Sequence, residues 1–278
     1  MSAARPPATT GHYVVPHRVE AWRERRTRYC LAIFVINEGP RLLAQLDRMQ
    51  PYTRLVDIIV ADGGSSDGST SASNLAGRGV RTLLVKQGPG RLGAQMVMAF
   101  DFALREGYDA VITMDGNDKD DPAAIPGFIS ALESGCQHVQ GSRYVPGGVA
   151  LNTPFLRKWG VRLVHAPLMR LAARWPYTDT TNGFRAYARE FLNDPRVSPF
   201  RAVFTGYELH YYLAIRAARL GYRVCEIPVT RAYPAAAPAP TKITPIRGNL
   251  RVLRALFAAC LNRFDPPSTP SGRETVHR

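Results

Sequence analysis

One stretch of the sequence, residues 110–122, constrains the fold more than any other. It begins with the five apolar or β-branched residues Ala110–Met114, which are typical of a strand buried on both faces. Four aspartates with a lysine among them follow at once, and Pro122 then opens a helical segment. In open α/β sheets, ligands bind at the carboxyl ends of the parallel strands. The stretch therefore predicts an acidic ligand site at the end of a buried strand.

The acidic cluster that follows this strand comprises Asp115, Asp118, Asp120 and Asp121, with Lys119 between them. Carboxylates crowded together repel one another, so such a cluster requires a compensating cation. A divalent metal, the metal of a bound polyphosphate, or nearby arginine and lysine side chains would each supply that charge. The alternative interpretation is a solvated acidic turn, and the rest of the sequence argues against it.

Strands and helices are predicted in alternation along the rest of the chain. An uninterrupted apolar run predicts a strand at Tyr29–Ile36. Further strands are predicted at Leu55–Ala61, Val80–Val85, His138–Tyr144 and Val224–Val229. Helical spacing of apolar residues predicts helices at Arg41–Met49, Gly93–Leu104, Pro154–Trp175, Gly206–Leu220 and Ile243–Leu261. This order predicts an α/β fold of the Rossmann-like kind, a mainly parallel sheet with helices on both faces. The glycine-rich turn at Gly88–Gly93 has the wrong spacing for a dinucleotide fingerprint, and the sequence contains no P-loop.

The net charge of +14 is unusual for a globular chain of 278 residues, and it comes mostly from arginine. Such a balance favours polyanionic partners, which include nucleotides, phosphorylated lipids, anionic membranes and nucleic acid. The four cysteines stand far apart without any CxxC spacing, which predicts reduced core thiols and neither a zinc site nor a disulfide framework. The sequence shows no apolar run long enough to span a membrane and no signal-peptide pattern, which predicts a soluble cytoplasmic protein.

Several motifs, taken in order, resemble a known family. Asn37-Glu38, the run Asp62–Ser69 and the run Met114–Pro122 resemble the family 2 inverting glycosyltransferases, which have a GT-A fold. Four further motifs are similar to the dolichyl/polyprenyl-phosphate mannosyltransferase branch: Gly141–Tyr144, Asp179–Tyr187, Glu226–Val229 and Thr241-Lys242. The resemblance implies a GT-A domain over residues 29–242, preceded by a flexible arm (1–28) and followed by an amphipathic helix and tail (243–278).

The resemblance also implies roles for individual residues. It assigns nucleotide-sugar binding to Asn37, Glu38, Asp62, Gly93, Asp115, Asn117 and Lys119. It assigns catalysis to Asp115, Arg185 and Asp179, and phosphate or acceptor binding to Arg143, Arg157, Arg185 and Lys242. Carboxylates suit ribose hydroxyls and base N–H groups because they only accept hydrogen bonds, and guanidinium pairs bidentately with phosphate.

The resemblance implies a divalent cofactor, Mg²⁺ or Mn²⁺, bound by Asp115 and Asn117, but two residues depart from the family pattern. Asn117 replaces the second acid of Asp-x-Asp, and Lys119 stands where this branch has a metal-binding glutamine. An amide is a poorer ligand for a hard dication than a carboxylate, and an ammonium repels the ion. These departures make the metal doubtful and predict that Lys119 supplies part of the ion's charge to the diphosphate.

The predicted function is hexosyl transfer from a nucleotide-sugar of the GDP-mannose or UDP-glucose type to a polyprenyl or dolichyl phosphate, with inversion. The acceptor lies in the bilayer, so the protein is expected to dock peripherally on the inner membrane face. One alternative is transfer to a sugar hydroxyl in cell-surface polysaccharide synthesis, which requires a general base such as Asp179 or Glu208. A basic nucleic-acid-binding protein is a remote alternative, and no recognition motif supports it. The sequence predicts no oligomeric state.

Overall fold

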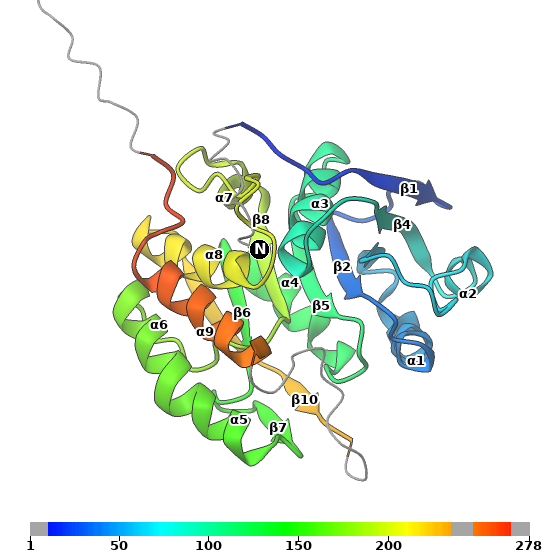
Figure 1. Cartoon of the computed structure of the whole chain (residues 1–278). Helices are drawn as coiled ribbons and strands as arrows, with labels where there is room; N and C mark the ends of the chain where they lie inside the picture. Colours follow the sequence, from blue (N-terminus) through cyan, green and yellow to red (C-terminus); the bar gives the residue numbers. More distant parts are fainter. Residues whose placement is uncertain (1–10, 235–246, 268–278) are drawn as a thin grey trace, which may run out of the picture.

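The computed structural model of the chain describes residues 11–234 and 247–267 (Figure 1). Its centre is an eight-stranded sheet in the order β1-β4-β3-β2-β5-β8-β6-β9. The strands are β1 (His17–Ala21), β2 (Tyr29–Val35), β3 (Val56–Asp62), β4 (Val80–Lys86), β5 (Ala110–Asp115), β6 (His138–Ser142), β8 (Arg185–Ala188) and β9 (Val224–Pro228). A small second sheet pairs β7 (Val149–Leu151) with β10 (Thr230–Ala232).

The core of the sheet is parallel, as the sequence predicts. β2 pairs in parallel with β3 on one side and β5 on the other, and β3 pairs in parallel with β4. All seven residues of β2 are buried, because helices cover both faces of the sheet. Cys30, Ala32 and Phe34 belong to one apolar core, and Leu31 and Ile33 belong to the other.

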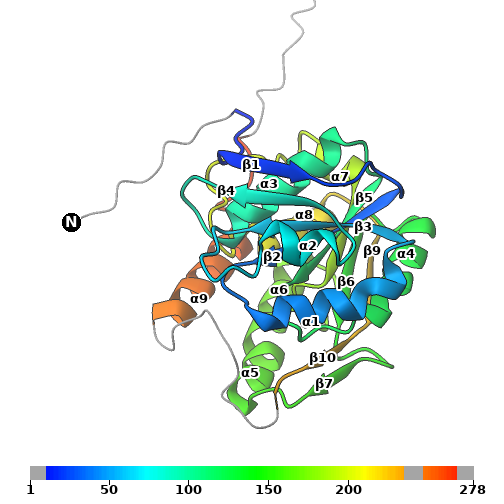
Figure 2. The ribbon, with the colours of Figure 1, turned by 90° about the vertical axis from the view of Figure 1, so that its right-hand side faces the viewer.

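The helices divide between these two cores (Figures 1 and 2). Five of the described helices contribute to the first core: α3 (Leu92–Arg105), α6 (Ala166–Ala173), α7 (Arg189–Asn193), α8 (Glu208–Arg219) and α9 (Arg247–Cys260). The second core receives α1 (Pro40–Met49), the short helix α2 (Ala72–Ala76) and α4 (Ile125–Glu133). The short α7 (Arg189–Asn193) follows β8. The prediction of a mainly parallel sheet with helices on both faces is confirmed.

The strand β8, inside the sheet, runs antiparallel to both of its neighbours, and the sequence analysis did not predict it. β8 pairs antiparallel with β5 and with β6, while β6 and β9 are parallel. β8 is only four residues long and begins with Arg185. It therefore lacks the long apolar run from which the other central strands are predicted. Its reversed direction places the loop that precedes it at the edge where the parallel strands end.

The prediction of a flexible arm over residues 1–28 is wrong for the part that the structure describes. β1 lies within this arm and pairs antiparallel with β4, from His17 opposite Lys86 to Ala21 opposite Thr82. Val15 is buried, and the backbone N–H of Tyr13 donates to the carbonyl of Phe200. The exposed and polar composition of β1 suits an edge strand, which packs one side only.

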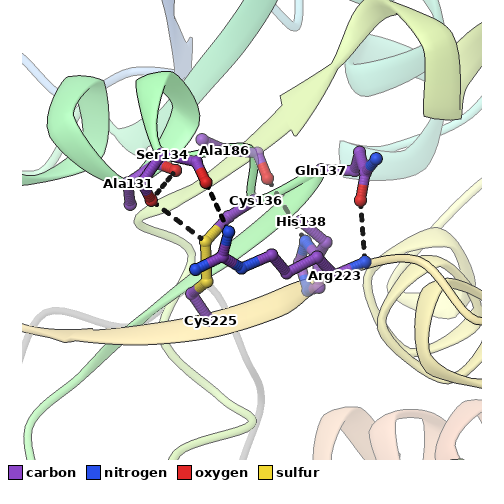
Figure 3. Close-up of a disulfide and its surroundings, with 8 residues drawn as sticks. All are labelled: Ala131, Ser134, Cys136, Gln137, His138, Ala186, Arg223 and Cys225. Atoms are coloured by element: carbon purple, nitrogen blue, oxygen red, sulfur yellow. Dashed lines mark hydrogen bonds between the residues drawn. A yellow bond between two sulfur atoms is a disulfide. The ribbon is translucent and has the colours of Figure 1, made fainter.

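The expectation that all four cysteines are reduced thiols is also wrong. Cys136 and Cys225 form a disulfide, with their Cα atoms 6.1 Å apart (Figure 3). The register of β6 and β9 pairs Val139 with Cys225, so strand pairing brings together two cysteines that are 89 residues apart. In the loop-entropy model, closing a loop of this length stabilises the fold by about 4 to 5 kcal/mol. Cys30 and Cys260 are free thiols.

Candidate active site

The carboxyl ends of three adjacent strands form the edge at which the predicted site residues gather. In the sheet register, Val35 at the end of β2 lies opposite Asp62 of β3, and the preceding Phe34 lies opposite Asp115 of β5. The two carboxylates therefore flank the end of β2. The backbone N–H of Gly116 donates to the Phe34 carbonyl at 2.9 Å, and a Cβ at this position would collide with Val35. Glycine is thus required directly after Asp115.

Two buried glutamines that the sequence analysis missed hold this edge together. Gln45 of α1 donates to the Asp115 carbonyl at 3.0 Å and accepts from the Asp118 N–H at 2.8 Å. Gln95 of α3 donates to the carbonyls of Val35 at 2.8 Å and Ala61 at 2.9 Å. A polar side chain on the buried face of an amphipathic helix was the sequence signal for both. Their hydrogen bonds tie the ends of β2, β3 and β5 to the helices α1 and α3.

The loops that follow β2 and β3 are joined by hydrogen bonds. The Asn37 side chain accepts from the Ser66 N–H at 2.8 Å, and the Asn37 N–H donates to Ser65 Oγ at 2.9 Å. Asp62 accepts from Ser65 Oγ at 2.6 Å and from Thr70 Oγ1 at 3.1 Å. The structure therefore brings the predicted nucleotide-binding residues Asn37 and Asp62 into one rigid unit. Glu38, beside Asn37, is buried and pairs with Arg41 at 2.9 Å.

Arg231 lies inside the acidic cluster, and the sequence analysis did not select it. Its Nη2 lies 3.0 Å from Asp115 Oδ2, and its Nη1 forms a short ion pair with Asp120 Oδ2. Arg231 is 6% exposed, and its segment continues directly from the Glu226–Val229 motif. The sequence left three sources of compensating charge open. In the structure an arginine, Arg231, supplies such a charge to the acidic cluster. The signal available in the sequence was a basic residue just beyond a family motif.

The neighbours of this cluster are Asn117 and Lys119, which depart from the family pattern. The Asn117 amide lies 3.5 Å from Asp115 Oδ2, and its Oδ1 is buried without a hydrogen-bond partner among the described residues. Lys119 is 5% exposed, and its Nζ lies 5.0 Å from the centre of the Tyr233 ring. Asn117 therefore lies beside Asp115, and the positive charge of Lys119 helps to lower the pKa of Asp115.

The two carboxyl groups that share Arg231 have different proton affinities. Burial alone would raise the pKa of Asp115, but the charge of Arg231 and the hydrogen bond from it outweigh burial, and the pKa is lowered. Burial and the repulsion from Asp115 both raise the pKa of Asp120. The attraction of Arg231 lowers this pKa but does not outweigh them, so the pKa of Asp120 is raised. Asp115 is thus the more acidic carboxyl group of the pair.

The residues of this cluster do not fit a conventional site for Mg²⁺ or Mn²⁺. Hard dications bind several oxygen ligands, most of them carboxylates. Here a guanidinium already lies against Asp115 and Asp120, the second predicted ligand is the neutral Asn117, and Lys119 adds another positive charge. Within residues 11–234 and 247–267, three or more His, Cys, Asp or Glu side chains are nowhere grouped to hold a metal.

Arg143 and Asp179 form an ion pair with each other. Arg143 Nε lies 2.6 Å from Asp179 Oδ2, Nη2 lies 2.9 Å from Oδ1, and the two side chains are 2% and 0% exposed. Glu226 accepts from the N–H groups of Thr178 at 2.9 Å and Asp179 at 3.1 Å, which fixes the same loop. Asp179 is therefore a partner of Arg143 in this structure, and the expectation that it acts as a catalytic residue is not supported by this geometry.

Arg185 is placed differently from the prediction of a phosphate ligand. It is 1% exposed, and its guanidinium donates to the carbonyls of Thr180 at 2.9 Å, Asn182 at 2.8 Å and His210 at 2.7 Å. These bonds hold the loop before β8 against α8. In this structure Arg185 therefore positions the loop, and its catalytic and phosphate-binding role stays a prediction.

The loop that Arg185 holds reaches the acidic cluster through Gly183. A Cβ added to Gly183 would come within 3.0 Å of Asp115 Oδ1, so the loop approaches the carboxylate closely. Gly93 has a similar role at another point of the edge. A Cβ there would come within 2.8 Å of the carbonyl oxygens of Phe204 and Gly206, so α3 begins in close contact with that segment. Nucleotide-sugar binding by Gly93 remains a prediction.

Two predicted phosphate-binding residues cannot be placed. Lys242 and the side chain of Arg157 lie outside the part of the chain that the structure describes. Glu208, the other candidate base, accepts a hydrogen bond from the Gly206 N–H at 2.5 Å. Apart from Gly93, the remaining predicted residues lie in two places. One is formed by the loops after β2 and β3 and the acidic cluster, and the other is the loop before β8 that Arg143 and Arg185 hold.

Replacing Arg185 with lysine is expected to lower the free energy of unfolding by about 1.5 to 3 kcal/mol, because lysine cannot reach all three carbonyls. Urea unfolding monitored by circular dichroism measures this change. Arg196→Lys, at an arginine whose side chain is 62% exposed, is the matched control and should change stability little. A variant Arg185→Lys that is as stable as the wild type but loses turnover would return Arg185 to the phosphate site.

Comparison with known proteins agrees with this arrangement of motifs. The profile of Glycosyl transferase family 2 matches residues 30–194. Polyprenol monophosphomannose synthase of Mycolicibacterium smegmatis is 31% identical over 214 residues, covering 74% of this chain and 78% of that protein. Undecaprenyl-phosphate mannosyltransferase of Micrococcus luteus is 31% identical over 202 residues, covering 70% of this chain and 79% of that protein.

The fold also matches a solved structure. The crystal structure of glucosyl-3-phosphoglycerate synthase from Mycobacterium tuberculosis, in complex with Mn²⁺, UDP and glucosyl-3-phosphoglycerate, superposes with a TM-score of 0.59. The alignment covers 84% of this chain and 79% of that chain at 19% sequence identity, so the likeness concerns the fold alone. With the family profile matched over more than half of its length, this chain belongs to glycosyl transferase family 2, and its mainly parallel sheet is the GT-A fold.

Proposed function

We propose that this protein transfers a hexosyl group from a nucleotide-sugar to a polyprenyl phosphate, with inversion at the anomeric carbon. The observation that carries the proposal is the likeness to two lipid-phosphate mannosyltransferases over about three quarters of the chain, with the motifs gathered at one sheet edge. Dolichyl-phosphate hexose transferase of Haloferax volcanii, 26% identical over 220 residues, supports the same class of reaction.

The joined loops after β2 and β3 are proposed to receive the nucleoside of the donor. They carry Asn37, Glu38 and Asp62, whose oxygen atoms suit the hydroxyls of ribose and the N–H groups of a base. Their hydrogen bonds to Ser65 and Ser66 hold both loops in place before the donor arrives, which reduces the conformational entropy lost on binding. The donor diphosphate would then extend toward Asp115 at the end of β5.

The acceptor phosphate does not need a general base, because it is already ionised at neutral pH. Transfer to a sugar hydroxyl would need a general base, and this difference distinguishes the two reactions. Both candidate bases for that alternative are engaged, Asp179 with Arg143 and Glu208 with the Gly206 N–H. The geometry therefore favours the phosphate acceptor, and we propose that Arg157 and Lys242 contribute cations to it.

The test of the function is a panel of nucleotide-sugars that includes GDP-mannose and UDP-glucose, each tried with and without a short polyprenyl phosphate. Released nucleoside diphosphate is measured, and the anomeric configuration of the product is determined by NMR. We expect release that depends on the lipid phosphate with at least one donor, and an inverted product. Release that occurs only with saccharide acceptors would favour the polysaccharide alternative.

The proposed acceptor requires access to a membrane surface. In the described ranges no helix is both long and apolar enough to cross a bilayer. The segment α5 (Phe155–Gly160) to α6 instead exposes large apolar side chains, with Phe155 at 71%, Leu163 at 67% and Leu171 at 80%. The neighbouring helix α9 adds exposed Leu250 and Phe257 (Figure 1). Arginines on the same helices include the exposed Arg162, Arg170 and Arg251.

We call this surface, formed by α5 to α6 and α9, the apolar-basic surface, and we propose that it docks on anionic lipid. Basic residues near an anionic membrane each contribute about 1 kcal/mol, and exposed apolar side chains add to the binding. Sedimentation with vesicles should show binding to anionic vesicles that falls with salt, and weak binding to neutral vesicles.

Leu163→Ser combined with Leu171→Ser should weaken the binding to anionic vesicles about tenfold or more, because two exposed leucines leave the interface. Leu55→Ser is the matched control, since this leucine is 41% exposed and precedes β3, outside the apolar-basic surface. Equal binding to neutral and anionic vesicles, or equal losses in the two kinds of variant, would contradict the proposed docking surface.

A further inference from the structure

We infer that Arg231 is the resident cation of the donor diphosphate site and takes the place of a divalent ion there. The inference rests on the proposed function, because it concerns how the same site holds the nucleoside diphosphate of the donor. It starts from the contacts of Arg231, whose guanidinium lies between the carboxylates of Asp115 and Asp120. A cation bound between two carboxylates at a strand end is the arrangement that the acidic cluster demands.

Arg231 is fixed in this position by the backbone on both sides. The N–H of Ala232 donates to the Lys119 carbonyl at 2.8 Å, and the N–H of Asp121 donates to the Thr230 carbonyl at 3.0 Å. On its other edge, the segment Thr230–Ala232 is the strand β10 and pairs with β7. The backbone of Arg231 is therefore fixed against the acidic loop by strand-like pairing, which a mobile arginine on the surface would lack.

The two ends of the guanidinium differ in their access to solvent. Asp120, at one end, has a fully buried side chain, whereas the side chain of Asp115, at the other end, is 28% exposed. Asp120 thus anchors Arg231, and the end near Asp115 lies on the side that an incoming diphosphate can reach. A planar guanidinium offers parallel N–H donors, which match the oxygens of a phosphate.

The charges around Arg231 favour an anionic ligand over an added metal ion. Lys119 is buried near the same ring of Tyr233, whose centre lies 5.0 Å from Lys119 Nζ and 5.9 Å from Arg231 Cζ. Asn117 contributes no negative charge beside Asp115. A dication at this place would have to displace the guanidinium from two carboxylates while a second cation repels it. A diphosphate is repelled by the Asp115 carboxylate, but it is attracted by both Arg231 and Lys119 and does not have to displace the guanidinium.

During transfer, the bond between the anomeric carbon and the β-phosphate oxygen breaks, and its electron pair stays on that oxygen. An oxygen of the acceptor phosphate forms the new bond to the anomeric carbon. Negative charge therefore develops on the leaving nucleoside diphosphate, and the Arg231 guanidinium neutralises it. A bound cation stabilises the charge of a phosphate leaving group in this way, and here a side chain supplies the cation.

The inference is tested by isothermal titration calorimetry of GDP and UDP, each in EDTA and in millimolar Mn²⁺. For the wild type we expect affinities that differ by less than about threefold between the two conditions. Arg231→Gln should weaken binding in EDTA about tenfold or more, which is the effect of losing a charged hydrogen-bonding partner. Mn²⁺ should then restore much of the binding, because the substitution leaves Asp115 and Asp120 without their cation.

Arg48→Gln is the matched control, since Arg48 pairs with Asp118 of the same acidic loop but is 45% exposed. Its nucleotide affinity should stay within about threefold of the wild type. Circular dichroism checks that each variant is folded, and Arg231→Lys provides a second variant that keeps the charge and removes the planar fork. It is expected to bind in EDTA with an affinity between those of the wild type and Arg231→Gln.

The outcomes separate this inference from the proposed function. Wild-type binding that requires Mn²⁺, together with unchanged binding by a folded Arg231→Gln, overturns the inference and leaves the proposed function standing. Nucleotide binding as expected, without transfer to polyprenyl phosphate in the panel of donors, overturns the proposed acceptor and leaves Arg231 in its role. Failure to bind either nucleotide under both conditions overturns both.

Discussion

Replacing Asp115 with alanine is expected to reduce turnover by about a hundred- to a thousandfold while the protein stays folded. Asp115 is the ionised carboxyl group at the end of β5, where it contacts Arg231 and lies against Gly183. Its loss releases one end of the guanidinium and removes the point at which the acidic loop meets the loop before β8. Asp120 still compensates the charge of Arg231, so the fold should persist.

The measurement is initial-rate transfer with saturating donor and acceptor, together with circular dichroism of each variant. Asp118→Ala is the matched control, because Asp118 lies in the same acidic loop but forms a partly exposed ion pair with Arg48. It should keep most of the turnover. If a well-folded Asp115→Ala variant retained near-normal turnover, Asp115 would not belong to the active site.

Replacing Asp179 with alanine is expected to lower the free energy of unfolding by about 3 to 5 kcal/mol, because it leaves Arg143 buried without its counter-ion. Both side chains of this pair are almost completely buried. The double variant Arg143→Met with Asp179→Leu removes both charges, so we expect it to be more stable than either single variant. Urea unfolding of the four proteins measures the coupling between the two residues.

Acid should have a related effect on the same pair. Burial alone would raise the pKa of Asp179, but Arg143 and backbone hydrogen bonds outweigh burial and hold the pKa below its ordinary value of 3.8. The pair therefore stabilises the fold above that pH, and the stabilisation is lost as pH falls through the lower pKa of the folded state. The double variant should lose less stability over this range. A stable Asp179→Ala variant without turnover would instead support a catalytic role.

The strands at the centre of the fold could be predicted because each is long, apolar and buried on both faces. The same pattern located Asp62 and Asp115, since a polar residue that ends such a run marks the edge of a parallel sheet. The roles of Asn37 and Asp62 came from the family resemblance, and the hydrogen bonds that join their loops were not predicted. Local sequence was sufficient for these features because neighbouring parallel strands bring their carboxyl ends together.

The features that could not be predicted depend on contacts between distant segments. Arg231 reaches Asp115 across 116 residues, and the Arg143–Asp179 pair spans 36 residues. The sequence analysis assigned Arg143 and Arg185 to phosphate binding, because the sequence contains no sign that Asp179 and backbone carbonyls would bind their guanidinium groups. β1 and β8 were missed because their short or polar sequences become strands only through the neighbours with which they pair.

The reversed strand β8 has a consequence for how this enzyme can diversify. Because β8 runs opposite to β6, the chain leaves the sheet after Ser142 and returns at Arg185 on the same edge. The intervening segment, which includes α5 and α6, is therefore an insertion whose two ends lie at the same edge of the sheet. The Arg143–Asp179 ion pair joins these two ends. Such an insertion can be lengthened, shortened or exchanged between homologues to suit a different acceptor. The loops after β2 and β3 and the sheet beneath them then stay unaltered.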